Sequence, residues 1–222
     1  MDKRFRILAI NPNSDLETCR SLEATIARFG GKDFTVDVRR LETAPLFIAT
    51  YEDRVAAVDE LCRLLRDCGG NYDAFIIACH ADPNLELVRE ITGKPVVGIG
   101  EASMKIAASL GNGFAIISPS SKTKSRKYAL AHKYHLGDFL KTVVVSNGDS
   151  GEDLLAAAQE ALIVPGVDAI VLGCANYTGA DGFIEDQLKI PVIDGFACAL
   201  FMAAGLARYE QYKQDSRENR GV

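Results

Sequence analysis

Short apolar runs alternate with longer amphipathic stretches along almost the whole chain. Such runs are typical of strands buried on both faces of a parallel sheet, and the stretches between them have helical periodicity. The predicted strands lie at 5–10, 34–39, 74–78, 95–98, 114–117, 141–145, 169–172 and 191–193. The predicted helices lie at 14–29, 52–67, 84–92, 101–110, 121–135, 152–163, 179–187 and 196–212. This alternation predicts an α/β fold with four strands in each half of the chain.

Particular residues predict where the first helix begins and ends and where the last one frays. Ser14 and Glu17 have the spacing of a capping box, so Ser14 is predicted to begin the first helix. Gly30 and Gly31 predict the end of that helix, because glycine favours the left-handed cap conformation. The polar residues 211–222 close the chain and are predicted to fray.

Three segments of the first half recur, in the same order, in the second half. The matched pairs are ILAINPNS (7–14) with FAIISPSS (114–121), YDAFIIACHADP (72–83) with VDAIVLGCANYTG (167–179), and KPVVG (94–98) with IPVID (190–194). The copies lie about 100 residues apart, which is the size of one small domain. The sequence therefore predicts an internal duplication.

Composition fits this organisation and disfavours several classes of function. The 222 residues are 48% hydrophobic, enough for one large core or two small ones. A net charge of −5 disfavours nucleic acid or a membrane surface as a partner. No apolar stretch approaches the roughly 20 residues that span a bilayer, and the N-terminus lacks a signal-peptide pattern. We therefore expect a cytoplasmic protein whose six cysteines are reduced thiols.

Candidate site residues gather where the predicted strands end. They are Asn13 and Ser14 after the first strand, Cys79, His80 and Ala81 after the third, Ser118 and Ser121 after the fifth, and Cys174, Ala175 and Asn176 after the seventh. In open α/β sheets, ligands bind beyond the carboxyl ends of the strands. The sequence therefore predicts a binding site at this edge.

Cys79 and Cys174 occupy equivalent positions of the repeat, each at the end of a strand. The other four cysteines lie in helical patterns and are interpreted as packing residues, the usual role of a buried thiol. Backbone N–H groups and the positive end of a following helix would favour the thiolate form of Cys79 and Cys174. A free thiol has a pKa of about 8.5, so a small downward shift makes it a useful base at neutral pH.

Two equivalent thiols favour one chemistry over its alternatives. A nucleophilic cysteine needs only one thiol and a base, and a redox centre usually has Cys-x-x-Cys, which is absent. A zinc site built from Cys79, His80, Asp82 and Cys174 would have no standard ligand spacing. Two-base proton transfer places a thiolate and a thiol on opposite faces of an acidic C–H, and it alone explains the repeat. We predict no metal and no cofactor.

Further groups are candidates for binding the substrate carbonyl, whose oxygen gains charge when the α-proton leaves. They are the backbone N–H groups of His80, Ala81, Ala175 and Asn176, and the side chains of Asn13, Ser14, Ser118 and Ser121. Asn13 and Ser14 could equally cap a helix. His80 could tune a neighbouring thiol or face solvent.

Three other features have plainer interpretations. Glu101 begins a predicted helix, where an acid favours the helix dipole more often than it serves catalysis. The basic stretch 122–135 is interpreted as a solvated helix face. The apolar segment 44–51 is either a flap over the pocket or a packed connection. No arginine or lysine lies in the loops assigned to the pocket, which disfavours an amino-acid substrate held by its carboxylate.

An ordered set of motifs resembles the aspartate/glutamate/hydantoin racemase superfamily, and most closely its hydantoin and allantoin racemases. The motifs are INPNS (10–14), ACHADP (78–83), GIGEA (98–102), LGCA (172–175) and PVIDG (191–195), and the resemblance covers nearly the whole chain. It implies two pseudo-symmetric Rossmann-like (flavodoxin-like) halves, each a four-stranded parallel sheet flanked by helices. We assign residues 1–97 and 195–222 to the first half and 98–194 to the second, with the active site in the cleft between them.

The resemblance also implies a cofactor-independent racemase in which Cys79 and Cys174 form an acid/base pair, each acting on one enantiomer. It implies a small-molecule substrate, most plausibly a 5-substituted hydantoin or allantoin, and a homo-oligomer. His80 and Ala81 depart from the residues common after the first cysteine, where the substrate ring should lie. An aspartate or glutamate racemase, a maleate isomerase-like enzyme and a non-catalytic ligand-binding relative stay open as alternatives.

Overall fold

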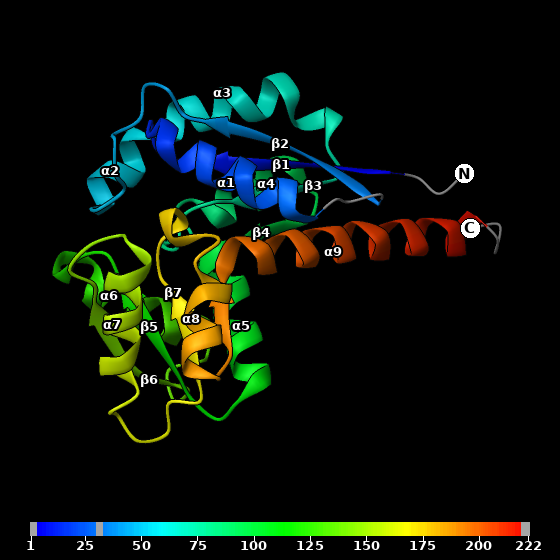
Figure 1. Cartoon of the computed structure of the whole chain (residues 1–222). Coiled ribbons are helices and arrows are strands. Elements are labelled where there is room, and N and C mark those ends of the chain that lie inside the picture. The colour runs from blue at the N-terminus through cyan, green and yellow to red at the C-terminus, as the bar shows by residue number, and fades with distance from the viewer. Residues whose placement is uncertain (1–3, 30–32, 219–222) are drawn as a thin grey trace.

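The computed structural model describes residues 4–29 and 33–218, and within them the chain forms two parallel four-stranded sheets. The first sheet contains β1 (Phe5–Asn11), β2 (Phe34–Arg40), β3 (Ala74–Ile77) and β4 (Val96–Gly98). The second contains β5 (Phe114–Ser118), β6 (Leu140–Val145), β7 (Ala169–Leu172) and β8 (Val192–Asp194). Their strand orders, β2-β1-β3-β4 and β6-β5-β7-β8, are the same. The predicted α/β class and the paired four-stranded sheets are confirmed (Figure 1).

Helices cover both faces of each sheet. They are α1 (Leu16–Phe29), α2 (Tyr51–Ala56), α3 (Val58–Cys68), α4 (Leu85–Thr92), α5 (Ile99–Leu110), α6 (Ser121–Lys133), α7 (Gly151–Ala161), α8 (Asp181–Leu188) and α9 (Gly195–Glu218), with 3₁₀ turns η1 (Gly69–Asn71) and η2 (Ala175–Tyr177). In β1, Ile7 and Ala9 pack with α1 and α9 on one face, whereas Leu8 and Ile10 pack with α3 and α4 on the other. This double burial explains why the strands read as continuous apolar runs.

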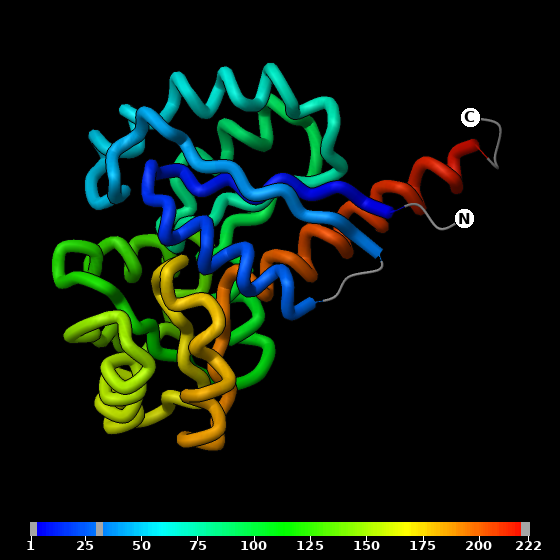
Figure 2. Tube along the Cα trace, turned by 45° about the horizontal axis from the view of Figure 1, so that its top comes forward, coloured from blue at the N-terminus to red at the C-terminus, as the bar shows by residue number. Residues whose placement is uncertain are grey.

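The two halves exchange their last helices. Helix α5 follows β4 of the first sheet but packs on β5, β7 and β8 of the second. Helix α9 follows β8 of the second sheet and packs on β1, β3 and β4 of the first, and α5 and α9 also contact each other. Figures 1 and 2 show α9 crossing from the second half to run along the first. The assignment of residues 1–97 with 195–222, and of 98–194, stays a prediction with which this packing agrees.

Several element boundaries differ from the sequence predictions. Helix α1 begins at Leu16, and the cap is Asp15, whose carboxylate accepts the N–H groups of Glu17 and Thr18. The Ser14 capping box is therefore wrong, because a carboxylate one residue later can accept both donors. The predicted end at Gly30 and Gly31 lies outside the described residues.

Two other helices also differ from their predictions. The predicted helix 52–67 is divided at Ala57, whose N–H reaches the carbonyls of both Asp53 and Val55. Helix α9 continues to Glu218, so the fraying predicted from residue 211 is wrong as far as the chain is described. Polar pairs along its surface, such as Gln211 with Asp215, support those turns. Among the helices of the described residues, none is both long enough and apolar enough to cross a bilayer.

Candidate active site

The two cysteines of the repeat have the same local geometry. Cys79 follows β3 and Cys174 follows β7, and each carbonyl accepts the N–H group three residues later, at 2.9 Å from Asp82 and 3.2 Å from Tyr177. The backbone N–H two residues beyond each cysteine, that of Ala81 or Asn176, hydrogen-bonds the sulfur and favours its thiolate. The sequence repeat is therefore also a repeat of the thiol environment.

Both cysteines line one cavity of about 390 Å³ between the two halves, a volume suited to a small ligand. Of the other predicted site residues, Asn13, His80, Ala81, Ala175 and Asn176 also line it. Phe47, Ile48 and Ala49 line it from the segment 44–51. The lining residues that the sequence predictions did not assign to the site are Thr18, Ala78, Pro119, Ser120, Thr123, Arg126, Lys127, Asp149 and Gly173.

Three of the predicted substrate-binding residues lie off the cavity wall. Ser14 uses its backbone to hold the neighbouring loop, with its N–H on the carbonyl of Pro45. Ser118 is fully buried and its hydroxyl bonds Thr123, while Ser121 is exposed at the start of α6. Ser120, the residue before Ser121, lines the cavity and also caps α6.

Two predicted site residues on the wall use their side chains within the protein. The Asn13 side chain accepts the N–H of Asp15, the cap of α1, at 3.0 Å, so it supports the cap residue and is not itself the cap. The Asn176 side-chain oxygen accepts the hydroxyl of Thr18, a contact between the second half and α1. Both residues therefore shape the cavity wall, and the Asn176 contact holds its two sides together.

Burial raises the pKa of both thiols. It raises the pKa of Cys79, and it raises that of Cys174 to about 11, although a backbone N–H opposes the shift at each sulfur. The prediction that a helix dipole favours the thiolates is wrong, because no helix begins directly after either cysteine. Helix α4 begins only at Leu85, and the turn η2 after Cys174 has three residues. The positive charge that favours both thiolates comes from Lys127.

Lys127 is a functional candidate that the sequence predictions missed. It lies in the basic stretch interpreted as a solvated face, yet it is 5% exposed. Its ammonium group donates to the carbonyl of Gly173 at 2.6 Å and to Nδ1 of His80 at 3.1 Å. The available signal was helical spacing, because Leu130 and Ala131, three and four residues later, are buried on the same face.

His80 is 2% exposed, so the solvent-facing alternative is wrong. Burial, and then the charge of Lys127, hold the pKa of His80 well below its usual range, so the ring is neutral. Because Nδ1 accepts from Lys127, Nε2 carries the hydrogen and donates to the Ser103 hydroxyl at 3.1 Å, which donates to the carbonyl of Gly100. The imidazole thus connects the start of α5 to Lys127.

Asp82 points away from the cavity toward the start of α5. Its carboxylate accepts the N–H groups of Gly100 and Glu101 and the hydroxyl of Tyr134. Within the described parts of the chain, no group of three His, Cys, Asp or Glu side chains could hold a metal ion, so the zinc alternative has no support. Glu101 lies in the first turn of α5, where an acid favours the helix dipole as predicted, and it also pairs with Arg89 and Lys105.

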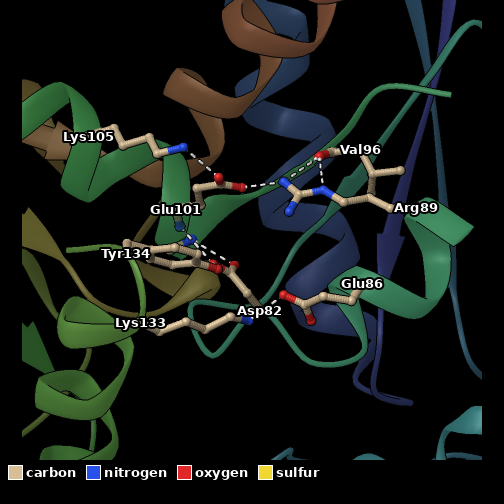
Figure 3. Close-up of polar contacts among 9 residues, drawn as sticks. Asp82, Glu86, Arg89, Val96, Glu101, Lys105, Lys133 and Tyr134 are labelled. Carbon is tan, nitrogen blue, oxygen red and sulfur yellow. Dashed lines mark hydrogen bonds and ion pairs between the residues drawn. The ribbon is translucent and has the colours of Figure 1, made fainter. Parts of the chain in front are cut away.

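Polar contacts fix the second half against the α4 side of the first (Figure 3). Glu86 pairs with Lys133 at 2.6 Å, and Asp82 meets the Tyr134 hydroxyl at 2.6 Å. In Figure 3 these two contacts lie next to each other at the end of α6. They hold the helix that carries Lys127 against the loop that carries Cys79.

The apolar segment 44–51 forms one wall of the cavity, through Phe47, Ile48 and Ala49. Phe47 is 60% exposed at the rim. Tyr51 lies under two guanidinium groups, 4.9 Å from that of Arg54 and 5.7 Å from that of Arg126. Arg126 and Lys127 line the cavity from helix α6, so the absence of arginine and lysine from the predicted pocket loops does not leave the cavity without a cation. Movement of the segment as a flap stays a prediction.

This geometry can be compared with known proteins. The sequence model of the family described as Asp/Glu/hydantoin racemase matches residues 7–203. The chain belongs to this family. The hydantoin racemase of Paenarthrobacter aurescens is 28% identical over 96% of both chains. Such relatives support the predicted class of enzyme, an isomerase.

Solved structures agree with the family assignment. Allantoin racemase from Klebsiella pneumoniae superposes with a TM-score of 0.85 at 26% identity, covering 93% of this chain and 89% of its own. The maleate isomerase of Pseudomonas putida S16 has a TM-score of 0.69 at 18% identity, covering 89% and 90%, which supports the fold alone.

Proposed function

We propose that the protein is a cofactor-independent racemase or epimerase that moves a proton between the two faces of a carbon next to a carbonyl. Cys79 and Cys174 are the acid/base pair: a thiolate removes the proton from one face and the opposing thiol donates to the other. The roles exchange in the reverse direction. The observation that carries the proposal is that two thiols with equivalent backbone environments line one cavity from the two halves.

The substrate we propose is a 5-substituted hydantoin or allantoin. The named relatives are hydantoin and allantoin racemases, and the cavity of about 390 Å³ suits a small ring with one substituent. The wall made by Phe47, Ile48 and Pro119 provides apolar contact for such a ring or its substituent. Charge that develops on the carbonyl oxygen lies in a cavity that Lys127 lines.

An aspartate or glutamate racemase is the second candidate. The observation that favours it is the pair of cations, Arg126 and Lys127, on the cavity wall, since an amino-acid carboxylate requires such partners. Asp149 on the same wall could bind an ammonium group. The two candidates share the two-thiol chemistry and differ in the substrate alone.

Isotope exchange in D₂O tests the chemistry without knowledge of the natural substrate. The purified enzyme is incubated with single enantiomers of 5-substituted hydantoins, allantoin, aspartate and glutamate, beside enzyme-free controls. We expect loss of the α-proton signal in the NMR spectrum of one class together with loss of optical rotation. Absence of exchange with every compound of the panel would contradict the proposal.

A further inference from the structure

The two-thiol scheme leaves a buried cation on the cavity wall without a stated role. Lys127 comes from α6 of the second half, and its ammonium group contacts Gly173, the residue before Cys174, and His80, the residue after Cys79. It therefore lies between the two strand ends that carry the thiols. Burial lowers the pKa of Lys127, and the negative charges of the two sulfurs are the first of the groups that oppose this shift.

The hydrogen-bond partners of this ammonium group are neutral. They are the carbonyl of Gly173, the ring nitrogen of His80 and, more weakly at 3.5 Å, the carbonyl of His80. Within the described chain, no carboxylate lies within ion-pair distance of it. A buried cation without an anion is costly, so an anion in the cavity stabilises it.

Other charged groups near the cavity do not supply that anion. The negative charge of Asp82 acts to raise the pKa of Lys127, but the Asp82 carboxylate is hydrogen-bonded to the start of α5 and to Tyr134. Arg54 acts on Lys127 as a like charge, and Asp149 acts as a like charge on a Cys174 thiolate. The remaining anions are the thiolates themselves.

We propose that Lys127 is the shared counter-ion of Cys79 and Cys174, holding the cavity at one ammonium, one thiolate and one thiol whichever sulfur carries the proton. The inference rests on the proposed function and deepens it. His80 is a positioning residue in this arrangement: its neutral ring can only accept from the ammonium through Nδ1, because Nε2–H is committed to Ser103.

The proton and charge counts of a turnover then balance. The substrate C–H breaks, its proton forms an S–H bond on the thiolate, and its electron pair moves to the carbonyl oxygen. The opposite S–H bond breaks, its proton forms the new C–H bond as the electron pair returns, and that sulfur becomes the thiolate. Lys127 keeps its three protons throughout. The negative charge moves from one sulfur to the other beside a cation that serves both.

Thiol alkylation tests this role without a substrate. The full chain is treated with iodoacetamide from pH 6 to 10, and the rates at Cys79 and Cys174 are read by peptide mass spectrometry. In Lys127→Met, we expect both pH midpoints to rise and both rates at pH 7.5 to fall, about tenfold for each unit by which the thiol pKa rises. Lys127→Arg keeps the charge and should retain part of the rate.

Two controls make the result specific. Lys124→Met removes an exposed charge from the same helix and should change neither midpoint. Cys62, a partly exposed cysteine away from the cavity, should alkylate equally in all variants. The proposal would be overturned if folded Lys127→Met were alkylated at both cysteines at rates within twofold of those in the unsubstituted protein.

A second variant covers the case in which Lys127→Met does not fold. In Cys79→Ala the ammonium group serves only one sulfur, so the alkylation midpoint of Cys174 should fall. An unchanged midpoint would mean that the thiols do not share a cation. Neither alkylation measurement depends on turnover. If no compound of the isotope-exchange panel were exchanged, the proposed function would be contradicted, but the alkylation test of Lys127 would still be valid.

Discussion

Asp82 occupies the space that the missing side chain of Gly98 leaves open. A Cβ atom on Gly98 would lie 2.3 Å from the Asp82 carboxyl carbon, and this carboxylate accepts N–H groups at the start of α5. In the sequence repeat, Asp194 occupies the position equivalent to Gly98. Its carboxylate accepts the N–H groups of Phe196 and Ala197 at the start of α9. The N-termini of α5 and α9, the two helices that cross between the halves, are thus each held by one carboxylate, and the two carboxylates come from different positions of the repeat.

Gly98→Ala should therefore destabilise the protein, by about 2 to 4 kcal/mol, because the new methyl group displaces a carboxylate that holds three hydrogen bonds. Urea unfolding monitored by circular dichroism measures this. Gly205→Ala in α9 is the matched control: nothing lies within 4 Å of its new methyl group, and alanine favours a helix. Equal effects of the two substitutions would contradict the assigned role of Asp82.

The same carboxylate should make stability depend on pH. Burial raises the pKa of Asp82 from 3.8 to about 6, with the hydrogen bonds from Tyr134 and α5 opposing the shift. The folded state therefore binds its proton more tightly than the unfolded chain, and stability contributed by the protonated form is lost as the pH rises from 4 to 6. A shift of this size corresponds to about 3 kcal/mol at most.

Unfolding free energies measured in urea at pH 4, 5, 6 and 7 check this prediction. Asp82→Asn cannot ionise, so the decline attributable to this group should be missing from its pH curve even though it loses hydrogen bonds at every pH. A constant difference between the two proteins from pH 4 to 7 would show that Asp82 titrates normally.

Selectivity at the cavity rim should depend on Arg126. Arg126 lines the cavity and its guanidinium lies 5.7 Å from the Tyr51 ring, so it can meet an anionic group of a bound molecule. Arg126→Met should raise KM for substrates with a carboxylate substituent by about tenfold, the effect of one charge-assisted contact, and change KM for apolar ones little. Lys124→Met is again the control. Equal changes for both substrate classes would assign Arg126 to the structure of the rim.

The sheets and the positions of the two thiols could be predicted because their signals are local. An apolar run that ends at a cysteine occurs twice, and both copies form a buried strand followed by the same turn. Repetition of the whole strand–helix order then fixed the fold class. These features need no knowledge of which distant residues meet.

The charge environment of the thiols depends on such meetings. Lys127 resembles a solvated lysine until α6 brings it to His80 and Gly173, residues 47 and 46 positions away. Asp82 resembles a loop carboxylate until Gly98 gives it room. Likewise, the thiol pKa was expected to fall near a helix end, whereas burial in the folded chain raises it. Sequence distance conceals these effects.

The last prediction concerns the separate roles of the two cysteines. Cys79→Ser and Cys174→Ser should each lower racemisation by about 10²- to 10⁴-fold, the usual contribution of a general acid or base. Each variant keeps one thiol that reaches one face of the carbon, so each should still exchange the α-proton of one enantiomer for deuterium without inverting it. The preferred enantiomers should be opposite in the two variants. Chiral chromatography combined with deuterium counting by mass spectrometry measures both properties, and Cys62→Ser, off the cavity, should behave as the unmodified protein. If both variants exchanged the same enantiomer, the thiols could not face opposite sides of the carbon, because the surviving sulfur differs between the two proteins while the rest of the cavity is the same.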